Sequence, residues 1–162
     1  SEGDEGGFDE EGDEQYMCNT RVWSSCIEGD LEAMKEAIES GGDPNATNYR
    51  WRNWSALHYA AHWGSTNCIM SLVQDYGVDV DPRCNEGYTP MLRAAKWSEM
   101  EAVKVLLGLG ADPWAENWQT HTALEMAQVF GNTALERLMW KATKLPHEGE
   151  HDDEHDWRGD DR

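Results

Sequence analysis

Aromatic residues recur at two fixed places along this chain, and their rings are its best candidates for chemistry. The first row lies immediately before a repeated Ser or Thr and contains Trp54, Tyr88 and His121. The second row lies eight residues after the same Ser or Thr and contains Trp63, Trp97 and Phe130. Large rings bury much apolar surface and attract cations over their faces, so both rows favour recognition of another molecule over bond-making chemistry.

Residue types that catalyse reactions are present, but they follow no catalytic pattern. The four cysteines, Cys18, Cys26, Cys68 and Cys84, show neither Cys-x-x-Cys spacing nor the density of a disulfide scaffold, so we expect reduced thiols. No nucleophile and general base fall in a motif that the repeats would bring together. We therefore predict a protein that is not an enzyme and that uses no cofactor.

Three histidines near the C-terminus have the spacing of metal ligands on a helix. His147, His151 and His155 are four residues apart and have acidic neighbours, so they could chelate a transition metal if the segment became helical. The surrounding sequence is too acidic and too poor in apolar residues to favour a helix. We expect a solvated tail there and predict no metal site.

The negative charge of the chain is concentrated at its two ends. The formal net charge is −19, from 13 Lys and Arg against 32 Asp and Glu. Residues 1–14 hold eight carboxylates with no Lys or Arg, and residues 148–162 hold eight with Arg158 and Arg162. Such segments bury too little apolar surface to offset the entropy of ordering, so we expect disordered acidic tails at 1–14 and 146–162. The tails either keep the protein soluble or compete for a basic partner.

The charge balance and the hydropathy pattern disfavour two kinds of partner. Binding to nucleic acid relies on Lys and Arg, which carboxylates outnumber here. No apolar run approaches the roughly 20 residues that cross a bilayer. We expect an intracellular protein of the cytoplasm or nucleus, or of an organelle after removal of a targeting peptide.

A repeat of 33 to 35 residues must position the aromatic rows. The Ser or Thr that opens each unit recurs at Thr20, Ser55, Thr89 and Thr122. After it come a short apolar helix and a second helix with an i, i+3, i+4, i+7 apolar stripe. A fixed period implies stacked units that each lack a complete core, predicted at 16–45, 49–81, 83–114 and 116–145 within a folded domain at 15–145. The spacing of Ser98 and Glu101 predicts a capping box.

Two motifs of the repeat resemble those of the ankyrin family. They are SALHYAAHWG at 55–64 and GADP at 110–113, and the resemblance covers about residues 16–145. It implies an all-α ankyrin-repeat solenoid of four helix-turn-helix units, with hairpin-like loops on one side and the inner helices lining a concave groove. The motif histidine survives only as His58, so we expect thinner polar bracing between repeats.

The resemblance also implies where a partner would bind. In this family the interaction surface lies on the loop before the Thr-Pro position and at the exposed end of the inner helix. The matching residues here are Tyr49, Trp51, Arg52, Trp54, His62, Trp63, Glu86, Tyr88, Trp97, Glu116, Trp118, His121 and Phe130. These rings either contact a partner or brace one repeat against the next.

The expected function is to bind another protein as an adaptor, chaperone-like receptor or inhibitor. Acidic residues near the rings favour a basic or amphipathic segment on the Trp-rich concave face, and an apolar peptide or helix fits as well. One alternative is self-association through the aromatic groove, giving a homo-oligomer or a subunit of a larger assembly. Another is a methyl-lysine or basic-tail reader, in which Trp54 and Tyr88 resemble the cages of some ankyrin domains.

Overall fold

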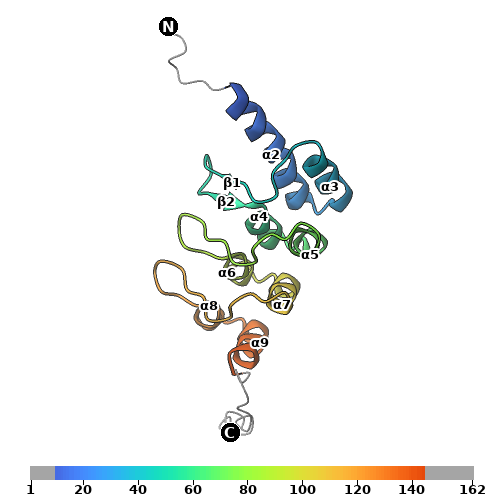
Figure 1. Cartoon of the computed structure of the whole chain (residues 1–162). Helices are drawn as coiled ribbons and strands as arrows, with labels where there is room; N and C mark the ends of the chain where they lie inside the picture. The colour runs from blue at the N-terminus through green and yellow to red at the C-terminus, as the bar shows by residue number, and fades with distance from the viewer. Residues whose placement is uncertain (1–9, 145–162) are drawn as a thin grey trace, which may run out of the picture.

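The computed structural model describes residues 10–144, which form four helix pairs and one short hairpin (Figure 1). The elements are α2 (Glu10–Glu28), α3 (Leu31–Glu39), β1 (Thr47–Asn48), β2 (Trp54–Ser55), α4 (Ala56–His62), α5 (Thr66–Gln74), α6 (Pro90–Lys96), α7 (Met100–Gly108), α8 (Ala123–Phe130) and α9 (Thr133–Lys144). Each odd-numbered helix packs against the helix before it. The predicted all-α solenoid is confirmed.

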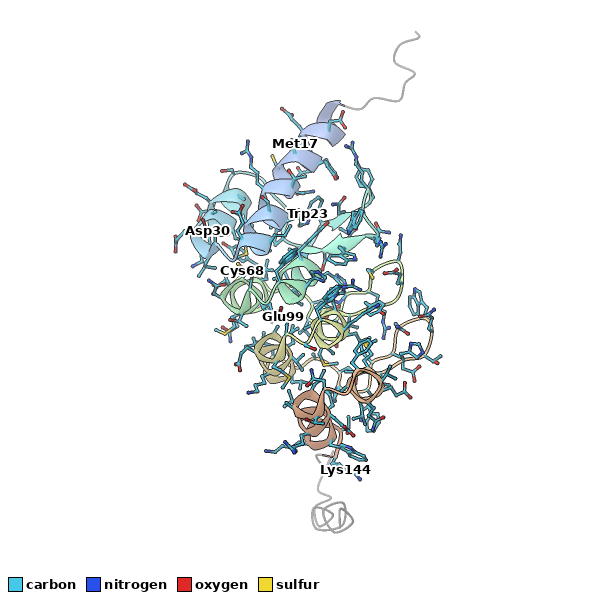
Figure 2. All side chains as sticks on the ribbon, turned by 180° about the vertical axis from the view of Figure 1, so that it is seen from behind. Met17, Trp23, Asp30, Cys68, Glu99 and Lys144 are labelled. Carbon is cyan, nitrogen blue, oxygen red and sulfur yellow. The ribbon has the colours of Figure 1, made fainter. Side chains whose placement is uncertain are left out.

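The helix pairs stack in chain order. The inner helices α2, α4, α6 and α8 contact one another in that sequence, and the outer helices α3, α5 and α7 do the same. Figure 1 shows α9 continuing the outer row and the long loops projecting from the inner-helix side. In Figure 2, Met17 and Lys144 lie toward opposite ends of the stack.

Three of the four predicted openings are helix caps. The side chains of Ser55, Thr89 and Thr122 accept hydrogen bonds from the backbone N–H three residues later, at the starts of α4, α6 and α8. This satisfies one of the backbone donors that a helix start leaves free. Thr20 differs because it lies inside α2, where its hydroxyl donates to the carbonyl of Met17 at 2.7 Å.

Two boundaries differ from the prediction. Helix α2 begins at Glu10, so residues 10–14 are helical and do not belong to a disordered tail; residues 1–9 and 145–162 lie outside the described part. Carboxylates stabilise the first turn of a helix, which is how an acidic run can open one. The capping box at Ser98 is wrong, since Glu99 precedes α7 and no side chain caps it. Ser98 instead has φ +59, close to Gly64 and Gly131 at +70.

One apolar core runs the length of the stack, between the inner and outer helices. Its largest fully buried side chains include Met34, Leu57, Ile69, Leu72, Met91, Leu92, Leu106, Leu135 and Met139. Each repeat contributes to this core and none encloses its share alone, as expected for a stacked-repeat protein.

The loops are tied to one another in register. The backbone N–H of Asn85 donates to the carbonyl of Arg52 at 2.9 Å, and that of Trp118 donates to the carbonyl of Glu86 at 3.1 Å. Gly87 has φ +83, and a Cβ there would lie 2.5 Å from Trp118. A side chain at this position would therefore separate the last two loops. Because the loops are fixed in line, the side chains on them form one continuous face.

Candidate protein-binding surface

The aromatic row at the base of the loops, Trp54, Tyr88 and His121, is mostly buried. Trp54 is 5% exposed and Tyr88 is 7% exposed, and only His121 is open to solvent. The Trp54 ring contacts the Tyr59 ring at a centroid distance of 5.1 Å. The prediction that Trp54 contacts a partner is therefore wrong, because the fold covers its ring. Tyr88 is mostly buried but lines a pocket between the last two repeats. We call these three residues the loop-base row.

The space between Trp54 and Tyr88 is filled by a cation of the same chain. The guanidinium of Arg93, on α6, lies 4.8 Å from the centroid of Trp54 and 5.0 Å from that of Tyr88. A methyl-lysine cage needs these ring faces free for the incoming cation. The methyl-lysine reader is therefore excluded at this pair.

The aromatic row at the ends of the inner helices, Trp63, Trp97 and Phe130, is open to solvent. These rings are 55%, 52% and 52% exposed. Trp63 and Trp97 terminate α4 and α6, and Phe130 is the last residue of α8. Since α4, α6 and α8 are stacked neighbours, the three rings follow one another along the inner-helix side. We call them the helix-end row.

His62 joins the two rows. Its ring centroid lies 5.3 Å from Trp54, 5.2 Å from Trp63 and 4.9 Å from Trp97. Its Nδ1 accepts a hydrogen bond from Nε of Arg93 at 3.4 Å. Burial, and then the nearby Arg93 charge, lower the pKa of His62. Accepting at Nδ1 requires the neutral ring with its proton on Nε2, so the lowered pKa and the hydrogen bond agree.

Three exposed rings of the loops, those of Tyr49, Trp51 and Trp118, lie beneath arginines of this chain. Arg50 is 4.1 Å from the centroid of Tyr16 and 5.5 Å from that of Tyr49. Arg52 is 5.2 Å from Trp51, and Arg83 is 5.2 Å from Trp118. Tyr49, Trp51 and Trp118 are thus on the surface, as predicted. The arginines of the chain therefore already occupy part of the space over these ring faces, where a cation of a partner would bind.

Of the two carboxylates predicted to attract a basic partner, that of Glu86 is engaged within the chain. Glu86 forms an ion pair with Arg52 at 3.2 Å. Glu116 is exposed, and its backbone carbonyl accepts a hydrogen bond from Arg83. Arg93 and Lys96 add positive charge beside the ring of Tyr88.

A pocket of about 270 Å³ lies between the last two repeats. Met126, Val129 and Phe130 provide its apolar wall, and Lys96, His121 and Glu125 provide polar groups. Glu125 is held in place because its carboxylate accepts from the backbone N–H of Thr122 at 3.1 Å. The space is sufficient for one apolar side chain of a partner, and it begins where the helix-end row ends.

His58 is structural. It is buried, its Nδ1 contacts the Ser55 hydroxyl at 2.9 Å, and its Nε2 meets the carbonyl of Tyr88 in the next repeat at 2.7 Å. Burial lowers the pKa of His58 to about 4. Among the described residues, no side-chain hydrogen bond to the next repeat is made at the equivalent places in the other repeats, Trp23, Leu92 and Glu125. Trp23 instead stacks on Tyr59 at 6.0 Å, on the hairpin side of α2 (Figure 2).

Two surface features were missed by sequence reasoning. Trp114 is 54% exposed in the last loop, but it belongs to neither aromatic row. Arg93 occupies the repeat position that Tyr59 and Met126 fill in the adjacent units. A charged residue on an apolar helix face was the signal for Arg93, because such a residue must find a partner or a special environment.

Residues 10–144 contain neither a metal cluster nor a membrane-spanning helix. Between residues 10 and 144 no three His, Cys, Asp or Glu side chains are grouped to hold a metal ion. None of the helices described there is long and apolar enough to cross a membrane. The three C-terminal histidines lie outside the described part.

Comparison with known proteins agrees with the helix pairs. The family model "Ankyrin repeats (3 copies)" matches residues 22–117, so the chain belongs to the ankyrin repeat family. The match contains three repeats, and the structure adds the pair α8 and α9 after it. Ankyrin repeats are protein–protein interaction modules, and this coarse function holds for the chain.

The curated relatives match this chain over a small part of their own length. The chain is 31% identical over 115 residues to serine/threonine-protein kinase 12 of Arabidopsis thaliana, covering 71% of this chain and 24% of that protein. It is 35% identical over 94 residues to protein phosphatase 1 regulatory subunit 12A of Mus musculus, covering 58% and 9%. With ankyrin repeat and SOCS box protein 2 of the mouse it shares 31% over 96 residues, covering 59% and 15%. The chain thus spans a quarter or less of each.

Proposed function

We propose that this chain binds an amphipathic segment of another protein on the helix-end row and in the adjoining pocket. The observation that carries the proposal is the outward exposure of Trp63, Trp97 and Phe130 on three consecutive inner helices. A continuous aromatic patch of this kind on a soluble domain marks an interaction site, and Trp is enriched among residues that dominate binding energy. The module would serve as an adaptor, chaperone-like receptor or inhibitor.

The charge of the partner follows from the rings that remain free. The loop rings of Trp51 and Trp118 already lie beneath arginines. The Glu86 carboxylate is ion-paired with Arg52. Within residues 10–144 no cation lies over Trp63, Trp97 or Phe130. The surface therefore offers apolar contact first, which favours an amphipathic segment over a purely basic tail.

Peptide selection tests this proposal directly. Random 16-residue peptides displayed on phage are selected on the immobilised full chain, and the dissociation constant of a selected peptide is measured by calorimetry. The double substitution Trp63→Ala and Trp97→Ala should weaken binding at least tenfold, while far-UV circular dichroism and the melting temperature stay close to wild type.

Trp114→Ala is the matched control, because it removes an equally exposed tryptophan outside the helix-end row. It should leave the affinity within about twofold. Equal losses for both variants, or a double variant that unfolds, would refute the proposal. Light scattering across concentration tests the self-association alternative, which requires a mass that rises with concentration in wild type and not in the double variant.

A further inference from the structure

Arg93 is a buried cation with most of its hydrogen-bonding capacity unused. The residue is 7% exposed, and a guanidinium carries five N–H donors. Within residues 10–144 its side chain makes one hydrogen bond, from Nε to Nδ1 of His62, and no carboxylate forms an ion pair with it. Burial lowers the pKa of Arg93, but a guanidinium stays protonated in a protein. The charge is therefore present, and no ion pair neutralises it among the described residues.

The surroundings hold this charge in place without neutralising it. The guanidinium lies 4.8 Å from the centroid of the Trp54 ring and 5.0 Å from that of the Tyr88 ring, and neither ring carries a net charge. Glu86, the carboxylate whose charge acts on Arg93, is ion-paired with Arg52. Lys96 adds a second cation nearby, with Nζ 3.3 Å from the hydroxyl of Tyr88. A buried charge is costly unless it is paired, and residues 10–144 supply no carboxylate that pairs with this one.

The cluster is continuous with the proposed binding surface. His62 contacts Arg93 on one side and the rings of Trp63 and Trp97 on the other. Tyr88 and Lys96 touch the cluster and also line the pocket that ends at Phe130. A segment lying on the helix-end row would therefore pass close to Arg93.

We propose that Arg93, assisted by Lys96, binds a carboxylate of the partner, supplied by an Asp or Glu beside the apolar residue that fills the pocket. This inference rests on the proposed function and specifies the chemistry of its ligand. A guanidinium is a planar fork that can donate two parallel hydrogen bonds to a carboxylate, and a site with little water strengthens them. The preference is thus for an apolar segment with an acidic residue, although the whole chain has a net charge of −19.

The test uses a peptide obtained by the phage selection and two synthetic analogues in which its Glu or Asp is replaced by the amide or by Lys. Wild type should bind the amide analogue about tenfold more weakly and the Lys analogue more weakly still. Arg93→Met should remove this difference, so that acid and amide peptides bind within about twofold of each other. Arg93→Lys should keep part of it, because it keeps the charge without the planar fork.

Lys104→Met is the control for general electrostatics, because Lys104 is an exposed lysine on α7. It should leave the preference for acid over amide unchanged. If wild type binds the three peptides equally, or prefers the Lys analogue, the inference is overturned, whether or not the Arg93 variants fold. If binding depends on Trp63 and Trp97 but not on the carboxylate, only this inference fails. If no selected peptide needs those tryptophans, the proposed function fails with it.

Discussion

The loop-base row and the helix-end row come from the same alignment of repeats, yet the fold treats them in opposite ways. Trp54 and Tyr88 precede the helix caps and lie under the loops, where the stacked repeats cover them. Trp63 and Trp97 lie where the chain leaves the helix, and more than half of each ring is exposed. The repeat period therefore identifies which residues are equivalent. Whether such a residue is buried depends on its position within the repeat.

The contact between the two rows is His62. It packs against Trp54 from the buried row and against Trp63 and Trp97 from the exposed row. A partner that binds the helix-end row would thus rest on a rigid, internally braced layer. Preorganised surfaces lose less entropy on binding, which gives the buried row an indirect role in recognition.

The largest expected effect is at Trp54. Trp54→Ala should lower the free energy of unfolding by about 3–5 kcal/mol, because it leaves a cavity between repeats and removes one face of the Arg93 sandwich. Urea denaturation followed by circular dichroism measures the change. Trp54→Phe is the control and should lose much less, since Nε1 of Trp54 has no hydrogen bond within residues 10–144. A loss below about 1 kcal/mol for the Ala variant would remove the distinction between the rows.

The second prediction concerns the pH dependence of stability and tests the contact between His58 and the carbonyl of Tyr88. His58 has a pKa of about 4 in the folded protein, against about 6.5 when unfolded. Below pH 6.5 the unfolded state binds the proton first, so stability is lost as the pH falls from 6.5 toward 4. The slope is about 1.4 kcal/mol per pH unit, or about 2 kcal/mol lost on going from pH 7 to pH 5.

Comparison with His58→Gln isolates this contribution, because the other titrating groups are common to both proteins. Wild type should lose about 2 kcal/mol more than the variant between pH 7 and pH 5 in urea titrations. His62, whose pKa is also lowered, contributes with the same sign to both. Parallel pH profiles for the two proteins would show that His58 is not buried in its neutral form.

The third prediction concerns the backbone turn that follows each ring of the helix-end row. Gly64, Ser98 and Gly131 follow the three rings, and each has a positive φ. Ser98→Gly should raise stability by about 0.5 kcal/mol, because glycine tolerates this conformation and serine is strained there. The gain is reduced by loss of the hydrogen bond from Asn132 to the Ser98 hydroxyl. Thermal unfolding measures it.

Gly131→Ser provides the reverse substitution. A Cβ at Gly131 would meet no atom within 4 Å, so the substitution introduces backbone strain without a clash. It should cost about 1 kcal/mol. If neither substitution changes stability, the left-handed turn is not what sets the direction of the rings.

Much of the fold was predictable because its signals are local. The Ser and Thr caps at Ser55, Thr89 and Thr122 act on N–H groups three residues away, so the sequence shows both partners. Burial of Trp54 was not predictable in this way, since the loops and the neighbouring repeats supply its cover. Arg93 illustrates the same limit: its helix and register could be predicted, whereas its place between two rings of different repeats depends on how the units stack.

The smallest expected effect on stability is at Trp63, and it is the other half of the comparison with Trp54. Trp63→Ala removes an equally large ring, but one that is 55% exposed, so the free energy of unfolding should change by no more than about 0.5 kcal/mol. The same urea titration measures it beside Trp54→Ala. A loss above about 2 kcal/mol would mean that the contact with His62 braces the repeats and that the helix-end row is structural as well. A small loss together with weakened peptide binding would assign stability to one row and recognition to the other.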